Sequence, residues 1–137
     1  MTDPTPASTV VIADDDVDIR RLVEMAVRRA GATVAASVGD GLAASAAVAE
    51  HVPDLAILDV SMPGRTGLEV CRDLRAHPAT KDVRVLILSA AVQPEAVEAG
   101  RAAGADEYAL KPFSPRTLAE KVRAMLAGAA SDPVQVR

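Results

Sequence analysis

The sequence contains almost no aromatic residues and only one cysteine. Among its 137 residues there is no tryptophan, one tyrosine (Tyr108) and one phenylalanine (Phe113), so aliphatic side chains must supply most of the core. Cys71 cannot form an intramolecular disulfide, and no cysteine or histidine stands at metal-ligand spacing from it. These absences argue against a disulfide-stabilised fold and a zinc site, and they fit a reducing compartment.

Excess positive charge and long apolar runs are also missing. The formal net charge is -4, whereas direct binding to nucleic acid or to anionic lipid needs a basic surface. No apolar run approaches the roughly 18 residues of a membrane helix. The first residues, MTDPTPAST, lack the charged start and apolar stretch of a signal peptide. We therefore expect a soluble, cytoplasmic protein that binds neither nucleic acid nor membranes directly.

Half of the residues are apolar, and short apolar runs alternate with longer amphipathic segments. Several of the runs are continuously apolar, which is typical of parallel strands covered on both faces. The expected strands are residues 9–13, 33–36, 54–59, 83–89 and 106–111. Apolar residues spaced three and four apart predict helices between them. Together these elements predict an α/β fold, a doubly wound parallel sheet of five strands with five helices.

Local signals mark where several of the helices begin. Asp16 and Asp40 stand at predicted N-caps, and Ser114 is followed by Pro115 in the first turn of the last helix. The helix expected near residues 94–103 is the weakest, because its apolar face consists of alanine and one valine. We expect one domain over residues 9–127, with flexible segments at 1–8 and 128–137, the latter a tail or part of a linker.

Polar side chains stand where the expected strands end. An aspartate triplet at 14–16 follows the first strand, and Asp59, Ser89 and Lys111 end the third, fourth and fifth. In an open parallel sheet, ligands bind outside the carboxyl ends of the strands, near the point where strand order reverses. Each residue alone has an ordinary explanation as a cap, a turn former or a surface charge. Their joint position predicts a functional site at one edge.

The residue types at this edge indicate phosphoryl chemistry. Clustered carboxylates repel one another unless a cation joins them, and Mg²⁺ takes oxygen ligands from carboxylates, backbone carbonyls and water. One carboxylate can attack phosphorus while the metal, Lys111 and the Ser89 hydroxyl neutralise the phosphoryl oxygens. The sequence therefore predicts a Mg²⁺ site at which a phosphoryl group is transferred to a carboxylate.

Four motifs resemble those of the receiver domains of two-component response regulators, which have a flavodoxin-like fold. They are VVIADDDVDIRRLV, LAILDVSMPGRTGLEV, VLILSA and GADEYALKPF, and the resemblance extends from Val10 to about Ala127. It implies that Asp59 is the phospho-acceptor and a metal ligand. Asp15 would bind Mg²⁺ directly, Asp14 would act largely through water, and the backbone carbonyl of Ser61 would complete the protein ligands.

The resemblance also implies a switch. Ser89 would hydrogen-bond the phosphoryl group, Lys111 would pair with it, and the Lys111-Pro112 peptide bond would be cis. Tyr108 would turn inward when Ser89 moves toward the phosphate, although a plain half-buried tyrosine is the alternative. Thr66 stands where an aspartate is frequent in the family, at a loop position outside the acceptor set.

The implied donor is a sensor histidine kinase or a histidine phosphotransfer protein. Phosphorylation would rearrange the face formed by the fourth helix, fifth strand and fifth helix, changing its binding to an unidentified protein target or to a second copy of the chain.

Three alternative functions stay open: a scaffold independent of phosphate, a phosphohydrolase and a flavin-binding protein. Phosphohydrolases of the haloacid dehalogenase type need a second aspartate where this chain has Ser61, and no loop aromatic is placed to stack on a flavin. We expect no enzyme activity beyond self-phosphorylation and autodephosphorylation.

Overall fold

The structure is a computed structural model and describes residues 8–91 and 93–130. Five parallel strands form one sheet in the order β2-β1-β3-β4-β5. The strands are β1 (Thr9–Ala13), β2 (Thr33–Val38), β3 (Leu55–Asp59), β4 (Arg84–Ser89) and β5 (Glu107–Leu110). The helices are α1 (Val17–Arg29), α2 (Gly41–His51), α3 (Gly67–Ala76), α4 (Pro94–Ala102) and α5 (Pro115–Ala130). The predicted fold class is confirmed, with element ends close to those expected.

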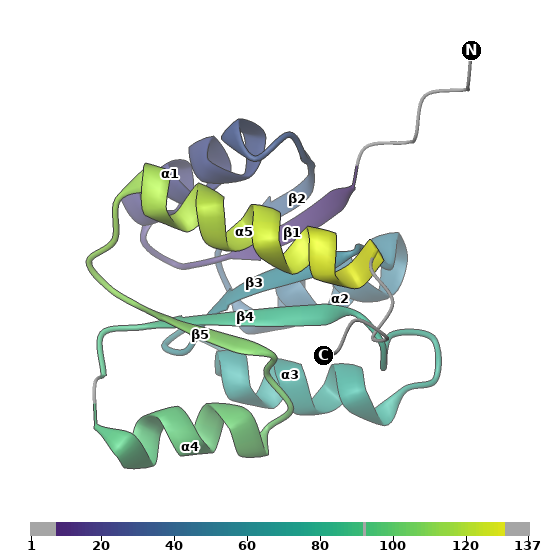
Figure 1. The fold of residues 1–137 in the computed structure, drawn as a ribbon. Coiled ribbons are helices and arrows are strands. Elements are labelled where there is room, and N and C mark those ends of the chain that lie inside the picture. The colour runs from purple at the N-terminus through teal and green to yellow at the C-terminus, as the bar shows by residue number, and fades with distance from the viewer. Residues whose placement is uncertain (1–7, 92, 131–137) are drawn as a thin grey trace, which may run out of the picture.

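Helices cover both faces of the sheet (Figure 1). Helices α1 and α5 pack on one face, and α2, α3 and α4 lie on the other. Alternate residues of β1, β3 and β4 point into the two cores: Val10, Leu55 and Leu86 into the first, and Val11, Ala56 and Val85 into the second. Because both faces of the sheet are buried, an apolar side chain stabilises the fold at every position of a central strand, which explains the continuous apolar runs. The edge strands β2 and β5 are less completely buried.

The predicted caps are present, and one further cap is found. The Asp16 and Asp40 carboxylates and the Ser114 hydroxyl accept hydrogen bonds from backbone N–H groups in the first turns of α1, α2 and α5. Thr66, expected only as a loop residue, caps α3 in a reciprocal capping box with Glu69. The Thr-x-x-Glu spacing is a known signal for such a cap. This box fixes the start of the helix that follows the Asp59 loop.

The ends of the chain and helix α4 can be compared with what the sequence predicts. Most of the predicted flexible segments, 1–8 and 128–137, lies outside the described residues, but residues 128–130 belong to α5, which continues to Ala130 beyond the expected domain end at 127. Alanine favours helix, which accounts for the extension. Helix α4 has no side-chain cap, and of its residues only Gly100 is buried. It is therefore the helix held by the least burial among those described.

Helix α2 ends on a strained residue. The backbone of Val52 has φ 41° and ψ 65°, a left-handed conformation that β-branched side chains disfavour. The side chain is 49% exposed, so little packing compensates. We expect Val52→Gly to raise the free energy of unfolding by about 1 kcal/mol, measured by urea denaturation.

The matched control for this substitution is Ala30→Gly at the end of α1. There φ is -76°, so glycine relieves no strain and should lower stability. Equal destabilisation by both substitutions would show that the Val52 conformation carries no strain.

Candidate functional site

Three aspartates converge at the carboxyl edge of the sheet. Asp14 follows β1 and Asp59 ends the neighbouring strand β3, which is where the strand order reverses. The side chains of Asp14, Asp15 and Asp59 each offer an oxygen within 4.8 Å of the others. Asp14 and Asp59 are buried, at 0% and 4% exposure, whereas Asp15 is exposed. The predicted convergence of these carboxylates is therefore seen in the structure.

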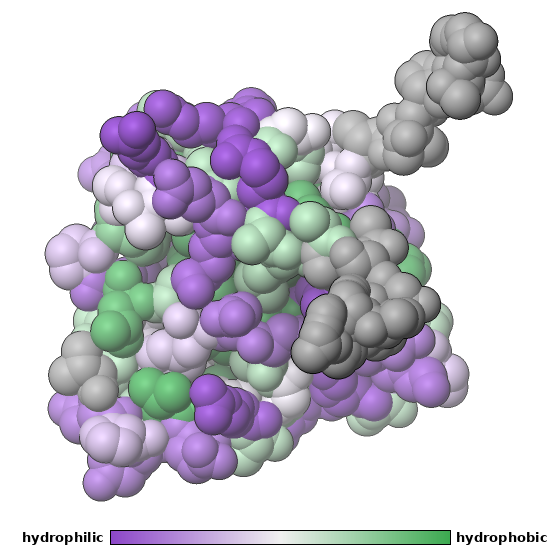
Figure 2. Space-filling view, in the orientation of Figure 1, coloured by the Kyte–Doolittle hydropathy of each residue, from purple (hydrophilic) through white to green (hydrophobic). Residues whose placement is uncertain are grey.

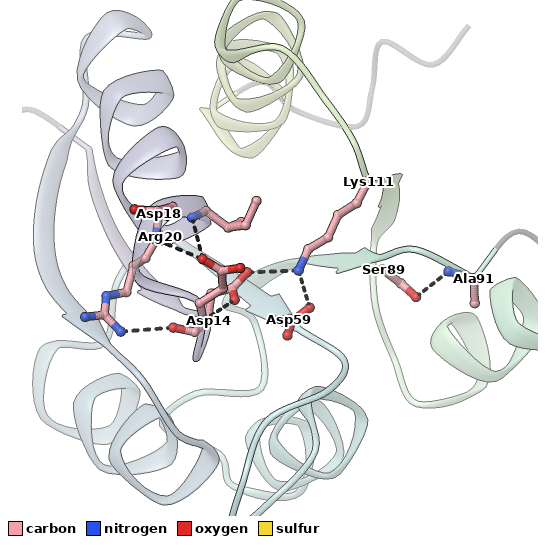
Figure 3. Close-up of polar contacts among 9 residues, drawn as sticks. Asp14, Asp18, Arg20, Asp59, Ser89, Ala91 and Lys111 are labelled. Atoms are coloured by element: carbon pink, nitrogen blue, oxygen red, sulfur yellow. Dashed lines mark hydrogen bonds and ion pairs between the residues drawn. The ribbon is translucent and has the colours of Figure 1, made fainter.

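Lys111 reaches this cluster from the loop after β5. Its Nζ donates a hydrogen bond to Oδ1 of Asp59 at 2.9 Å and lies 3.1 Å from Oδ2 of Asp14 (Figure 3). Its backbone N–H donates to the Ser89 carbonyl at 2.8 Å, and the Lys111-Pro112 peptide bond is cis. The long side chain thus spans from β5 past the end of β4 to the acidic residues.

The charges at this edge do not balance. Burial raises the pKa of Asp59, and the Asp14 and Asp15 charges raise it further, against the opposing effect of Lys111. Burial alone would lower the pKa of Lys111, but its hydrogen bond to Asp59 and its attraction to the Asp59 and Asp14 carboxylates outweigh this effect and raise the pKa. The lysine therefore stays protonated, and one ammonium faces three carboxylates.

The raised pKa of Asp59 predicts a pH-dependent cost in stability. A carboxyl whose pKa is higher in the folded state loses stability as pH rises from its unfolded value through the folded pKa. In metal-free buffer, we expect Asp59→Asn to be more stable than the wild type at neutral pH, because asparagine does not ionise. The difference should shrink below the ordinary aspartate pKa of 3.8. Urea denaturation with EDTA across this range measures it, and a pH-independent difference would contradict the explanation.

The donor set fits a divalent cation. Mg²⁺ binds through carboxylates, carbonyl oxygens and water, and three carboxylate oxygens lie together here. Oδ2 of Asp14 is buried without a hydrogen bond, although Lys111 Nζ lies within ion-pair distance. The exposed position of Asp15 leaves water access on one side. Asp14, Asp15 and Asp59 could therefore hold Mg²⁺, whose charge would offset the carboxylates that Lys111 leaves unneutralised.

In the described part of the chain, neither the Ser89 hydroxyl nor the Ser61 carbonyl, the two predicted serine contributions, is hydrogen-bonded to the three aspartates. Ser89 is buried at the end of β4, but its hydroxyl accepts the Ala91 N–H at 3.0 Å and points away from Asp59 (Figure 3). Ser61 lies exposed in the turn that follows β3. Side-chain orientation is a property of the local loop, which strand-end position alone did not reveal.

Tyr108 and Ser89 contact the same residue. The half-buried tyrosine donates its hydroxyl to the Ala91 carbonyl at 3.1 Å, while Ser89 accepts the N–H of that residue. A Cβ added at Gly100 would lie 3.0 Å from the Tyr108 ring, so this glycine makes room in α4 for the ring. The absence of a side chain at 100, inside the helix expected to be the weakest, thus has a packing reason.

Cys71, Phe113 and the two histidines lie outside the acidic site. Cys71 is fully buried in the second core, and burial raises the pKa of its thiol. Phe113 packs partly buried against the first core, and His51 and His77 are exposed. Within residues 8–91 and 93–130, no helix has both the length and the apolar character needed to cross a membrane.

One residue near the site was not anticipated. Nη1 of Arg20, in α1, donates to the backbone carbonyl of Asp14 at 2.9 Å (Figure 3). A single arginine on an amphipathic helix carries no distinctive signal, so only the folded chain reveals this contact.

Known proteins share both the sequence and the fold. Residues 10–123 match the Response regulator receiver domain family. The chain is 36% identical over 132 residues to the DNA-binding response regulator MtrA of Mycobacterium tuberculosis, covering 96% of this chain and 56% of that protein. It is 34% identical over 118 residues to the phosphate regulon transcriptional regulatory protein PhoB of Pseudomonas aeruginosa, covering 86% of this chain and 51% of that protein.

The chain thus spans little more than half the length of these curated relatives. A solved structure of the chemotaxis response regulator CheY4 of Vibrio cholerae superposes with a TM-score of 0.80 at 33% identity, covering 88% of this chain and 99% of that one. The match across most of the sequence, together with the shared fold, shows that the chain belongs to the receiver domain family of two-component response regulators.

Proposed function

We propose that this receiver domain accepts a phosphoryl group on Asp59 and thereby changes how its α4-β5-α5 face binds a partner protein. The observation that carries the proposal is the buried Asp59 carboxylate, 2.9 Å from Lys111 Nζ and grouped with Asp14 and Asp15. The family is a signalling domain rather than a classical enzyme. A scaffold independent of phosphate is not favoured, because the acidic set and the lysine are intact.

Asp59 is suited to act as the nucleophile. Its carboxylate oxygen would attack the phosphorus of a phosphohistidine, forming an O–P bond while the donor N–P bond breaks and its electron pair returns to the imidazole. The hydrogen bond from Lys111 favours the ionised form of the carboxyl, and its ammonium would neutralise charge on the phosphoryl oxygens. Mg²⁺, when bound, supplies further positive charge for those oxygens. Asp14, Asp15, Asp59 and the Ser61 carbonyl are the proposed ligands.

Ser89 and Tyr108 are the proposed switch. The Ser89 hydroxyl would leave the Ala91 N–H and turn toward the phosphoryl group, disturbing the residue that also accepts the Tyr108 hydroxyl. Phosphorylation would act by favouring one of two arrangements of this loop and of the lightly buried helix α4. The loop thus links the acceptor edge to the α4-β5-α5 face.

Apolar surface on that face supports a protein partner. Apolar side chains gather between α4 and α5, at the open edge of the sheet (Figure 2). Leu110 is 44% exposed, and a groove of about 260 Å³ is lined by Val97, Arg101, Tyr108 and Leu110 among others. We propose a sensor histidine kinase or a histidine phosphotransfer protein as the donor, and a protein target or a second copy of this chain on this face.

The test is phosphorylation by a small donor. The chain incubated with acetyl phosphate and Mg²⁺ should gain one phosphoryl group by intact-mass spectrometry, and EDTA should remove most of the gain. Metal dependence follows because three clustered carboxylates must be partly neutralised before an anionic donor can approach. No gain with Mg²⁺, or an equal gain in EDTA, would contradict the proposal.

A further inference from the structure

We infer that Arg20 is a positioning residue for the acidic site and that Gly39 leaves the space in which its guanidinium lies. The inference rests on the proposed function, because the proposed Mg²⁺ site is what Arg20 would support. Arg20 lies in α1 and Gly39 follows β2, so neither belongs to the strand-end set that forms the site. Their role would be to hold the loop that carries Asp14 and Asp15.

The structure holds Asp14 through both its backbone and its side chain. The Asp14 N–H donates to the Val38 carbonyl at 3.0 Å, and its carbonyl accepts from Arg20 Nη1 at 2.9 Å. Its Oδ1 accepts the Asp16 N–H at 2.9 Å, which leaves Oδ2 facing Lys111 at 3.1 Å. Because the residue is 0% exposed, a lost contact is not readily replaced by water.

The Arg20 contact acts on the peptide that joins the two acidic residues. The Asp14 carbonyl belongs to the peptide plane leading into Asp15, so fixing it restrains the directions of both side chains. These are the carboxylates that meet Asp59 within 4.8 Å. In Figure 3 the Arg20 guanidinium and the Lys111 ammonium approach Asp14 from opposite sides. Arg20 therefore orders the loop without occupying the space between the carboxylates.

Gly39 leaves space for the guanidinium. A Cβ added at Gly39 would lie 2.9 Å from Arg20 Nη1, closer than real Cβ contacts, while the Asp14 carbonyl oxygen would be 4.0 Å away. The backbone of Gly39 is not among the positive-φ glycines, so other residues can adopt its conformation. A side chain at position 39 would therefore act by displacing Arg20. Its effect should disappear when the guanidinium is absent.

The first experiment measures Mg²⁺ affinity of the full chain by isothermal titration calorimetry. We expect Arg20→Met to weaken Mg²⁺ binding about tenfold, as loss of an outer-shell partner of metal ligands does. Long-range electrostatics alone predicts tighter Mg²⁺ binding by Arg20→Met, because the substitution removes a positive charge that repels the cation. Arg21→Met, at the exposed neighbouring position, removes the same charge and should not weaken binding. Equal affinities for Arg20→Met and the wild type would overturn the inference.

The second experiment is a double-mutant cycle with Gly39→Ala. Alone, this substitution should weaken Mg²⁺ binding in the same direction as Arg20→Met. In the Arg20→Met background it should add little, because the atom it would collide with is gone. Additive effects of the two substitutions would overturn the inferred connection between these residues.

Thermal unfolding in EDTA separates positioning from folding. Should Arg20→Met unfold at the assay temperature, Arg20→Lys and Gly39→Ala provide the measurement, and wild-type affinity in both folded variants would refute the inference. The measurements also distinguish failure of this inference from failure of the proposed function. A wild-type chain that neither binds Mg²⁺ nor takes up a phosphoryl group refutes the proposed function. A wild type that does both, with an Arg20→Met variant that matches it, refutes this inference alone.

Discussion

Asp59→Asn is expected to abolish phosphorylation of the domain by acetyl phosphate and Mg²⁺. The amide has nearly the shape of the carboxylate, so the end of β3 should keep its structure, but its neutral oxygen is a poor nucleophile. The loss should be complete by intact-mass spectrometry, because no second acceptor is proposed. The carboxyl is 4% exposed and beside Lys111, which sets it apart from the surface acids.

Asp82→Asn is the matched control for this substitution. Asp82 is exposed in the loop before β4, at the edge of the sheet opposite the acidic cluster. The substitution therefore removes one carboxylate without touching the site. It should gain the phosphoryl group as the wild type does. A full gain on Asp59→Asn would move the acceptor to another residue, and peptide mapping of the modified chain would then locate it.

Lys111→Met is expected to impair both the stability and the phosphorylation of the domain. Methionine keeps much of the apolar stem but removes the ammonium that lies 2.9 Å from Asp59 and 3.1 Å from Asp14. Two buried carboxylates would then face each other without this counter-charge. Breaking a fully buried pair costs about 3–5 kcal/mol, and the 20% exposed lysine side chain suggests a smaller loss, about 2 kcal/mol, in metal-free buffer.

Two measurements separate these effects. Urea denaturation with and without Mg²⁺ should show that the metal restores part of the lost stability, because it supplies positive charge to the same carboxylates. The rate of phosphoryl uptake should remain about 100-fold lower, since the cation that neutralises the phosphoryl oxygens is missing. Lys81→Met, at an exposed position, should change neither quantity. Uptake at the wild-type rate would show that Lys111 has no part in the transfer.

Much of the fold could be predicted because its signals are local. The apolar runs at β1, β3 and β4 identified buried parallel strands, since each residue there faces one of two covered cores. The caps at Asp16 and Asp40 were equally readable, because a cap needs only a side chain and the next turn of backbone. The Thr66 capping box had a readable signal that was interpreted only as loop.

The acidic site was also predictable from local signals, together with the rule that parallel strands end at the same edge of a sheet. Parallel strands bring their carboxyl ends to one edge of the sheet, so strand-end positions alone predict that Asp14, Asp59 and Lys111 lie together, as they do. The charge balance followed from residue type. What remained hidden was orientation: the Ser89 hydroxyl bonds to Ala91 because of the path of the loop after β4.

The contacts that escaped prediction join segments far apart in the chain. Arg20 meets the Asp14 carbonyl only where Gly39 leaves room, and Gly100 is small because the Tyr108 ring lies against it. Residue type and periodicity describe each segment alone, whereas these fits depend on how two or three segments pack against one another. Sequence pattern thus accounts for the elements and for the edge where the chemistry lies, while close packing sets the direction of each group at that edge.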